Sequence, residues 1–522
     1  MEEEFSYAST AELVEAASDF AYHSGFQSDS SAKDFLDRFP LPVIINALQT
    51  KADVPGLEND LVACLERIFR TRYGASLIPQ YMPFVVGGLG ADSQRVRCLA
   101  CKTVSCLLEN DTDVAVQLVQ DYDLYPLMLN CLIDGDERVA TASMDAIKNL
   151  AGSSKGMEII FPANSNETTH LRNLVARCSS LGRVRILALL VKLFSISTAV
   201  ASTIYNSNLL SLLETEVSNA SDALVTLSVL ELFYELAEIP HSTEFLSRTT
   251  LLQLLSSMIS NASVESIIRS RAMTISGRLL SKENTYMFID ESSVKAVISA
   301  IDGRLGLLKS QDADECESAL EALGQIGSSI QGAALLLSSA PPAARHVVDA
   351  AFVRQGHGRQ LAALHALGNI CGETRSENNI LLNGDTEESL RRLIYETASK
   401  TSKLTPAGLI PSVLQQDSEI RVAGYRLITG LVARSWFLME ICSREEILSI
   451  VTDTYTETTK IGMEARHKCC QAIRKAFMSS KLSSDPALGG IAAKLHEAVQ
   501  RGPYLAGKHS ESQPAVMTAE RF

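Results

Sequence analysis

The chain has 522 residues, which at about 150 residues per domain would make three or four domains unless one repeat architecture runs through it. Its 47 Lys and Arg residues against 61 Asp and Glu residues leave a formal net charge of −14, which argues against nucleic acid or an anionic membrane as partner, since both are bound through clustered Lys and Arg. Because 46% of the residues are hydrophobic and 21% are charged, the chain can bury a core, and a disordered protein is excluded.

The N-terminus gives no sign of a targeting segment. It reads Met1-Glu2-Glu3-Glu4, without the basic stretch and apolar core of a secretory or mitochondrial presequence. Even the apolar stretch Ile186–Phe194 carries Lys192, and no run reaches the roughly 18 apolar residues of a membrane-spanning helix. The 11 cysteines fit a compartment that keeps thiols reduced better than a disulfide framework. We therefore expect a protein of the cytoplasm, with the nucleus as a second compartment.

A helical pattern recurs along the chain. A short turn rich in Asp, Ser and Gly precedes a segment in which positions 0, +4 and +7 are apolar or small, as on one face of a helix. The clearest copy covers residues 92–108, with Asp92 as the expected cap or turn and Ala100, Val104 and Leu107 as the stripe. The first residues of the stripes, here called anchors, are Leu61, Ala100, Ser143, Leu187, Val229, Ala272, Ala319, Ala363, Gly424 and Cys469.

The spacing of the anchors predicts the architecture. Successive anchors lie 39 to 47 residues apart, except for 61 residues between Ala363 and Gly424. Armadillo and HEAT repeats have a period of about 40–47 residues. Segments before the anchors, such as Leu124–Ile133 and Leu251–Ile259, also suit helices, so each repeat is expected to contain a helix pair. Strand signals are sparse.

The sequence therefore predicts an all-α fold, a right-handed α-solenoid of about ten armadillo/HEAT-like repeats over residues 1–505. We expect an N-terminal cap at about 8–50, with a loop at 24–33, and a flexible C-terminal tail at 506–522. We attribute the long interval before Gly424 to an insertion at about 383–418, an inserted loop with Pro406, Gly408 and Pro411, because Pro and Gly end helices.

Motifs of catalysis are missing from the sequence. There is no GxxxxGK[ST] phosphate loop, no HExxH zinc helix and no GxSxG nucleophile elbow. Cys98 and Cys101 form a C-x-x-C pattern, but on an expected helix and without a second such pair, so we interpret them as ordinary helix cysteines. The run Arg466-His467-Lys468 is expected on a solvated helix face. We predict no catalytic residue, no metal and no cofactor, hence no enzyme, and a convergent buried cluster of titratable residues would reopen that alternative.

A partner-binding groove is expected opposite the stripes. Positions +2 and +6 lie about 180° from the anchors and would line a concave surface. Most are polar, although +6 is Leu193 and Gly430 in two repeats. The predicted groove residues are Asp145, Asn149, Glu231, Glu235, Arg278, Glu321, Gln325, His365, Asn369 and Arg426. The acidic members around Glu231, Glu235 and Glu321 are expected to steer a basic face of a protein partner.

Transport of basic peptides is disfavoured by the same positions. Nuclear-import adaptors of the armadillo type pair each groove Asn with a Trp one turn earlier. Here Asn149 and Asn369 are preceded by Asp145 and His365, and the single Trp of the chain is Trp436.

Three segments resemble the proteasome non-ATPase regulatory subunit 5 family. They are Ser310-Gln311-Asp312 leading to Leu323-Gly324-Gln325-Ile326-Gly327-Ser328, the helix Ala423–Leu431 followed by Trp436, and the closing Gly502-Pro503-Tyr504.

The resemblance implies a chaperone for assembly of the base of the proteasome regulatory particle. Such a chaperone grips the C-terminal domain of one AAA ATPase subunit, holds it together with neighbouring base subunits, and delays docking onto the core particle. The resemblance supplies no contact residues, so the groove rests on periodicity. An armadillo-type scaffold or adaptor unrelated to the proteasome is the alternative.

Overall fold

The structure is a computed structural model that describes residues 7–50, 54–162, 168–219, 222–307, 312–353, 356–401, 403–484 and 488–504. Over these ranges every regular element is a helix, and none of the helices combines the length and apolar character needed to cross a bilayer. The chain divides into two compact units, Met1–Phe245 and Leu246–Phe522, here called unit 1 and unit 2. The expected tail at 506–522 lies outside the described residues, and a single solenoid over 1–505 stays a prediction.

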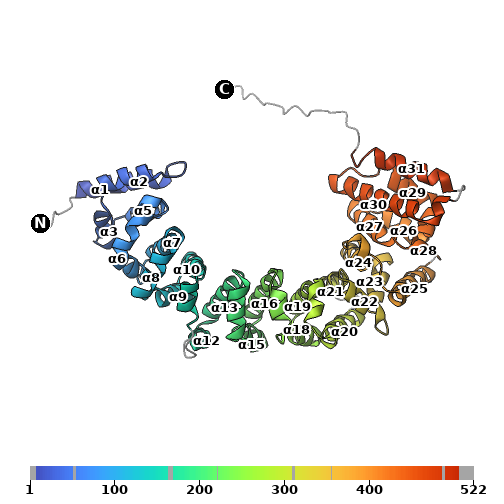
Figure 1. The fold of residues 1–522 in the computed structure, drawn as a ribbon, viewed down its shortest axis with the longest axis horizontal. Helices are drawn as coiled ribbons and strands as arrows, with labels where there is room; N and C mark the ends of the chain where they lie inside the picture. Colours follow the sequence, from blue (N-terminus) through green and yellow to red (C-terminus); the bar gives the residue numbers. More distant parts are fainter. Residues whose placement is uncertain are drawn as a thin grey trace, which may run out of the picture. The chain divides into compact units, whose positions relative to one another are not determined.

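Unit 1 is a succession of helices in chain order (Figure 1). They are α1 (Tyr7–Tyr22), α2 (Asp29–Arg38), α3 (Leu41–Thr50), α4 (Leu57–Phe69), α5 (Arg72–Leu77), η1 (Ile78–Tyr81), α6 (Met82–Leu89), α7 (Gln94–Asn110), α8 (Thr112–Asp121), α9 (Leu124–Asp134), α10 (Glu137–Leu150), α11 (Ser154–Ile160), α12 (Thr168–Arg177), α13 (Ser180–Phe194), α14 (Thr198–Asn206), α15 (Ser211–Asn219), α16 (Ala223–Glu238) and α17 (Ser242–Leu246), which reaches the boundary between the units.

Unit 2 continues with the same kind of element. Its helices are α18 (Leu251–Ser260), α19 (Ser266–Leu280), η2 (Glu283–Met287), α20 (Glu291–Leu307), α21 (Ala313–Ile326), α22 (Ile330–Ser338), α23 (Ala344–Phe352), α24 (His357–Ile370), η3 (Glu377–Asn379), α25 (Gly384–Lys400), α26 (Pro406–Leu414), α27 (Ser418–Leu431), α28 (Ser435–Cys442), α29 (Glu445–Thr452), α30 (Lys460–Ser479), η4 (Lys481–Ser484) and α31 (Gly489–Gln500).

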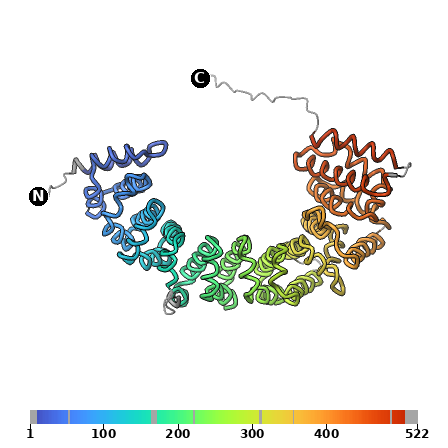
Figure 2. Tube along the Cα trace, in the orientation of Figure 1, coloured from blue at the N-terminus to red at the C-terminus, as the bar shows by residue number. Residues whose placement is uncertain are grey.

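The helices repeat in groups of three rather than in the expected pairs. The anchors lie on α4, α7, α10, α13 and α16 in unit 1 and on α19, α21, α24, α27 and α30 in unit 2. We call these the third helices, because two shorter elements precede most of them, as α8 and α9 precede α10. Within each unit neighbouring third helices pack on one another, for example α7 on α10 and α21 on α24. Figure 2 shows this chain-order stacking in each unit, which confirms the predicted all-α repeat solenoid.

Local sequence explains where the third helices begin and what they bury. Ser93 caps α7 by accepting a hydrogen bond from Val96 N, and Asp92, expected as the cap or a turn residue, lies in the bend before it. Asp136 caps α10 in the same way. Every anchor and its +4 and +7 partners are buried, with Ala476 alone half-buried, so the predicted stripes form the core. The polar anchor Ser143 is accommodated because its Oγ donates to the Met128 carbonyl at 2.6 Å.

Two expected loops are largely helical. The segment at 383–418 holds α25 and α26, and Pro406 and Pro411 both lie within α26. A proline in the first turn costs no helical hydrogen bond, and the bond that Pro411 removes is outweighed by burial of residues such as Leu409 and Ile410. At 24–33, the backbone is non-helical only up to Ser28, whose side chain accepts from Ser31 N and starts α2.

Candidate functional site

The candidate surface is the face of the third helices opposite the anchors. All ten predicted groove residues lie at least partly exposed on this face, and we call them the third-helix ridge. The expectation of exposure is wrong for Leu193, which is fully buried, and for Gly430, where an added Cβ would lie 3.2 Å from Cys371 Cβ. At these two positions a neighbouring segment covers the helix. A binding role for the ridge stays a prediction.

On α10 the ridge residues join neighbouring third helices of unit 1. Asp145 Oδ1 lies 2.6 Å from Lys192 Nζ of α13. The Asn149 side-chain amide donates to Ser105 Oγ at 2.7 Å and to Glu109 Oε1 at 2.8 Å, both on α7. The N–H donors of Asn149 are therefore engaged in hydrogen bonds within the protein.

On α16 the ridge carries an acidic pair. Glu231 and Glu235 are one turn apart and exposed. Partial desolvation raises the pKa of the Glu235 carboxyl, the Glu231 charge raises it further, and Lys192 opposes both. Two like charges on one helical turn repel each other.

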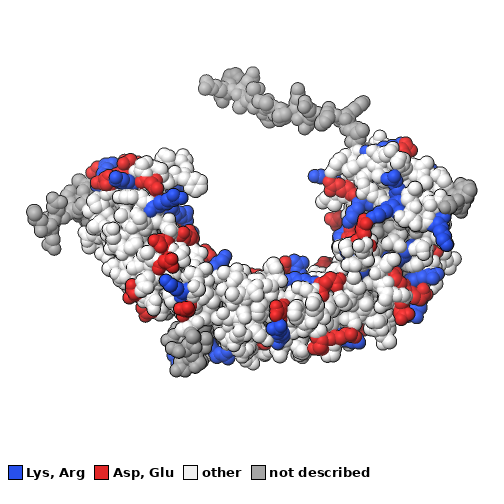
Figure 3. Space-filling view, in the orientation of Figure 1, with Lys and Arg blue, Asp and Glu red and all other residues white. Residues whose placement is uncertain are grey.

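In unit 2 the ridge includes an ion network between α24, α27 and α30. Arg426 donates to His365 Nδ1 at 3.0 Å and to Glu373 Oε2 at 2.9 Å, and Lys468 Nζ donates to Glu373 Oε1 at 2.6 Å. Burial lowers the pKa of His365, and the Arg426 charge lowers it further, which keeps the imidazole neutral as an acceptor. In Figure 3, acidic and basic side chains lie next to one another over the C-terminal repeats of unit 2.

Helical periodicity did not predict two members of that network, Glu373 and Lys468. Glu373 lies beyond the end of α24, where no helical register applies. The run at 466–468 was expected on a solvated face, yet Arg466 is fully buried and donates to the Val451 carbonyl at 2.9 Å. Only Lys468 matches the expectation, with 60% of its side chain exposed.

A polar pocket brings three ridge residues of unit 2 together. Arg278, Gln325 and Asn369 line a cavity of about 460 Å³ at the C-terminal ends of α19, α21 and α24. Its other lining residues are Ser281, Glu283, Ser328, Thr374, Arg375, Ser376 and Asn379. The connection that follows α24 supplies four of these seven side chains, and the stripe pattern gave no signal for them.

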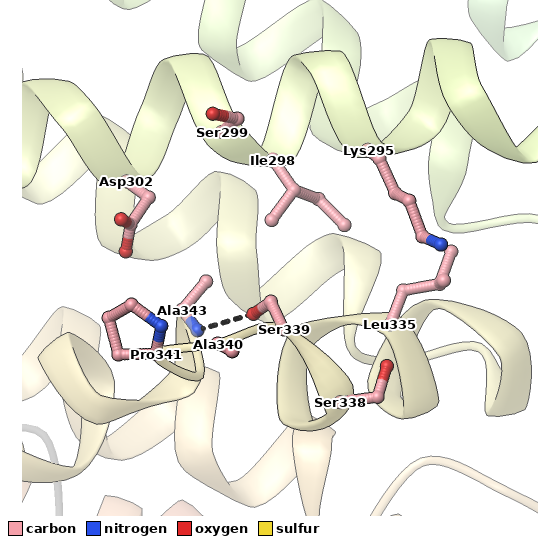
Figure 4. A pocket seen from close by; sticks show the side chains of 10 residues that line it. All are labelled: Lys295, Ile298, Ser299, Asp302, Leu335, Ser338, Ser339, Ala340, Pro341 and Ala343. Carbon is pink, nitrogen blue, oxygen red and sulfur yellow. Dashed lines mark hydrogen bonds between the residues drawn. The ribbon is translucent and has the colours of Figure 1, made fainter.

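A second pocket in unit 2, of about 310 Å³, lies between α20 and the connection from α22 to α23 (Figure 4). Its Ser339 Oγ accepts from Ala343 N at 3.0 Å. Its one carboxylate, Asp302, is held by Arg345 at 2.7 and 3.1 Å. These polar groups are engaged in holding the connection in place.

A pocket of about 740 Å³ in unit 1 includes Cys98 of the C-x-x-C pattern. The Cys98 thiol donates to the Arg138 carbonyl, and burial raises its pKa, so the thiol is not activated as a nucleophile. Cys101 is buried. The pair behaves as the helix cysteines that we expected.

One group with metal-ligating atoms occurs within the described ranges. His357, Asp417 and Glu419 each offer an atom within 4.8 Å of the others, and all three are exposed. Asp417 already caps α27 through Glu419 N and Ile420 N and pairs with His357 at 3.2 Å. Capping and the ion pair account for this arrangement.

Among the known proteins that this chain is similar to, one matches over a short segment and another is a distant structural match. A segment of 147 residues is 31% identical to the U3 small nucleolar RNA-associated protein 10 of Emericella nidulans, covering 27% of this chain and 8% of that protein. The chain thus matches only a small part of that relative. The crystal structure of an engineered protein aligns over 89% of this chain and 98% of its own, with 14% identity and a TM-score of 0.44.

A family match covers nearly all the repeats. The model of the proteasome non-ATPase 26S subunit family matches residues 59–520, from α4 through the last described helix, α31. The chain therefore belongs to the proteasome non-ATPase 26S subunit family.

Proposed function

We propose that this protein is a chaperone for assembly of the base of the proteasome regulatory particle. It would grip the C-terminal domain of one AAA ATPase subunit, hold it with neighbouring base subunits, and delay docking onto the core particle. It would be released when the regulatory and core particles join. It would act in the cytoplasm and in the nucleus.

The family match over residues 59–520 carries this proposal. The repeats support it, because stacked third helices present a row of polar side chains over many repeats, and repeat proteins commonly bind partners along such a surface. The side chains of the ridge bear both signs of charge, from Glu231 and Glu235 to Arg278 and Arg426, which suits a folded protein partner better than a polyanion.

The test uses the full chain and purified proteasome parts. The tagged chain is incubated separately with the isolated C-terminal domain of each base ATPase subunit, and then with complete proteasomes that carry their regulatory particle. We expect one ATPase domain to be retained and the complete proteasome not to be retained. Added salt should weaken the complex, because part of the attraction is between surface charges.

A second measurement tests the delay of docking. Purified base and core particle are mixed with increasing amounts of the chain, and capped particles are counted on native gels. An unchanged rate of capping would refute the delay. Retention of complete proteasomes, or of no ATPase domain, would favour the scaffold unrelated to base assembly.

A further inference from the structure

The pocket at the C-terminal ends of α19, α21 and α24 has an unusual balance of hydrogen-bonding groups. Helix C-termini expose unpaired carbonyls and carry partial negative charge, so a cavity at three such ends would ordinarily attract a cation. In this pocket the protein supplies the cation itself. Arg375 donates to the carbonyls of Gly327 at 2.7 Å, Ile370 at 2.9 Å and Ser328 at 3.0 Å. The acceptors of α21 and α24 are therefore already bound.

The single carboxylate of the wall is also bound. Glu283 Oε1 accepts from Ile330 N at 2.6 Å, at the first residue of α22. The guanidinium groups of Arg278 and Arg375 line the same pocket. Arg278 has a further interaction partner, but a guanidinium carries five N–H donors and can serve a second acceptor. The lining is therefore rich in N–H donors.

Gln325 adds an amide to the lining of the pocket. Its Oε1 is shut off from solvent without a hydrogen-bond partner, on the side of Gly277, whose added Cβ would lie 2.8 Å from it. Because the oxygen faces the protein, the amide nitrogen is the polar end that lines the pocket. Asn369 stands at the matching position of α24 and makes no side-chain bond like those of Asn149 in unit 1.

We propose that this pocket binds a carboxylate group of the protein partner, with Arg278, Gln325 and Asn369 as the recognising side chains. A carboxylate offers two acceptor oxygens, which suit the N–H donors of this lining. The group would come from an acidic side chain or from a chain terminus. The inference rests on the proposed function for the identity of the partner, and not for the chemistry of the pocket.

The rest of α21 gives the pocket a role in orientation. Glu321 lies one turn before Gln325, and partial desolvation and the neighbouring Glu317 raise the pKa of its carboxyl. Along α21 the ridge therefore passes from the acidic Glu321 to the neutral amide of Gln325, beside Arg278 of α19 in the pocket. A partner with an acidic group next to a basic face would bind in one direction only, since reversal would oppose like charges.

The test uses three N-acetylated hexapeptides of alanine with one variable residue. The first has a Glu side chain and an amidated end, the second a Gln side chain and a free α-carboxylate, and the third a Gln side chain and an amidated end. Saturation-transfer NMR with the full chain measures their binding. We expect saturable binding of at least one acidic peptide, and the peptide that binds identifies a side chain or a terminus as the source.

Variants of the pocket complete the test. Gln325→Glu and Asn369→Asp each place a carboxylate in the pocket and should weaken binding of the acidic peptide about tenfold or more. Gln253→Glu, on the exposed side of α18, adds the same charge elsewhere and should leave binding unchanged. Circular dichroism checks that each variant is folded. Equal binding of the neutral peptide, no saturable binding of either acidic peptide, or intact binding by both pocket variants would overturn the proposal.

Binding of the ATPase domain, measured beside binding of the peptides, distinguishes this proposal from the proposed function. If acidic peptides bind but no ATPase domain does, the pocket stands and the assembly role fails. If an ATPase domain binds wild-type chain and Gln325→Glu equally well, and the peptides do not discriminate, the assembly role stands and the pocket proposal fails.

Discussion

Replacing Glu315 with Gln should destabilise unit 2. Glu315 is on α21, and its side chain is 1% exposed. Its carboxylate accepts from Arg269 Nε at 2.9 Å and Nη2 at 2.6 Å, and from Arg304 Nε at 2.8 Å. Because the three residues come from α19, α20 and α21, this cluster joins the helices of one repeat to the next.

The expected loss follows from the two charges left behind. The arginine side chains are 9% and 11% exposed, and removing one partner of a buried ion pair costs about 3–5 kcal/mol. We expect a loss near the lower end, about 3 kcal/mol, because Arg269 keeps its hydrogen bond to the Val264 carbonyl. The assay is urea unfolding, followed by hydrogen exchange of peptides from α21, since a repeat protein of this size can unfold in steps.

The same ion cluster predicts that the stability of the fold depends on pH. Burial by itself would raise the pKa of the Glu315 carboxyl, but the hydrogen bonds and charges of Arg269 and Arg304 outweigh it and hold the pKa below the usual 4.5. A carboxyl whose pKa is lowered in the folded state stabilises the fold fully at pH values above its pKa in the unfolded chain. This stabilisation is lost as the pH falls through the folded-state pKa. The difference between wild type and Glu315→Gln should therefore be full at pH 7 and shrink below about pH 4.5.

A loss under about 1 kcal/mol at pH 7, or a difference that does not change with pH, would refute this reasoning. Glu388→Gln is the matched control. Glu388 is 68% exposed and pairs with Arg391 one turn away at 3.6 Å, and such surface pairs contribute about 0–1 kcal/mol.

Three further predictions concern the core, the ridge and the packing of third helices. Leu323→Asp puts an unpaired charge at the fully buried +4 position of a stripe and should lower the free energy of unfolding by several kcal/mol, measured by urea unfolding. Glu231→Arg combined with Glu235→Arg should impair capture of the ATPase domain in a pull-down while helicity by circular dichroism is unchanged. Gly324→Ala should lower the free energy of unfolding by about 1–3 kcal/mol, because the added Cβ would lie 2.5 Å from a Cα atom of α24. Gly303→Ala is the matched control: its added Cβ meets nothing within 4 Å, so it should raise the free energy of unfolding by about 0.5–1 kcal/mol.

Each of these three predictions has its own control or its own contradicting outcome. Glu158→Arg makes one such Glu-to-Arg change, half the charge change of the double ridge variant, at an exposed position of α11, and an equal loss of capture there would contradict a specific ridge. If Leu323→Asp were as stable as wild type, the stabilising role of the buried stripe would be contradicted. A stabilising Gly324→Ala would show that α21 and α24 can separate without cost.

Helical periodicity determined the core of this protein. A residue at 0, +4 and +7 faces one side of any helix, so the anchors of the third helices could be identified one by one, and they are buried. The same logic placed the ridge on the exposed side. The first and second helices of most repeats are shorter than the third helix, so they carry fewer turns of the pattern, and the sequence suggested pairs where there are three.

Proline was misleading for a related reason. Local preference predicts that Pro406 and Pro411 interrupt a helix, and in an isolated peptide Pro411 would be costly. In the protein both residues are buried within α26, because the apolar side chains of that segment gain more from burial than one missing hydrogen bond takes away.

Only the tertiary structure decided which polar side chains are engaged inside the protein and which remain for a partner. Asn149 and Asn369 occupy the same position of their repeats, yet Asn149 is bound to α7 and Asn369 lines a pocket. Glu315 and Arg269 are 46 residues apart, and Glu373 meets Lys468 across 95 residues. Such partners are chosen by the packing of one repeat on the next, and periodicity within a single helix carries no information about them.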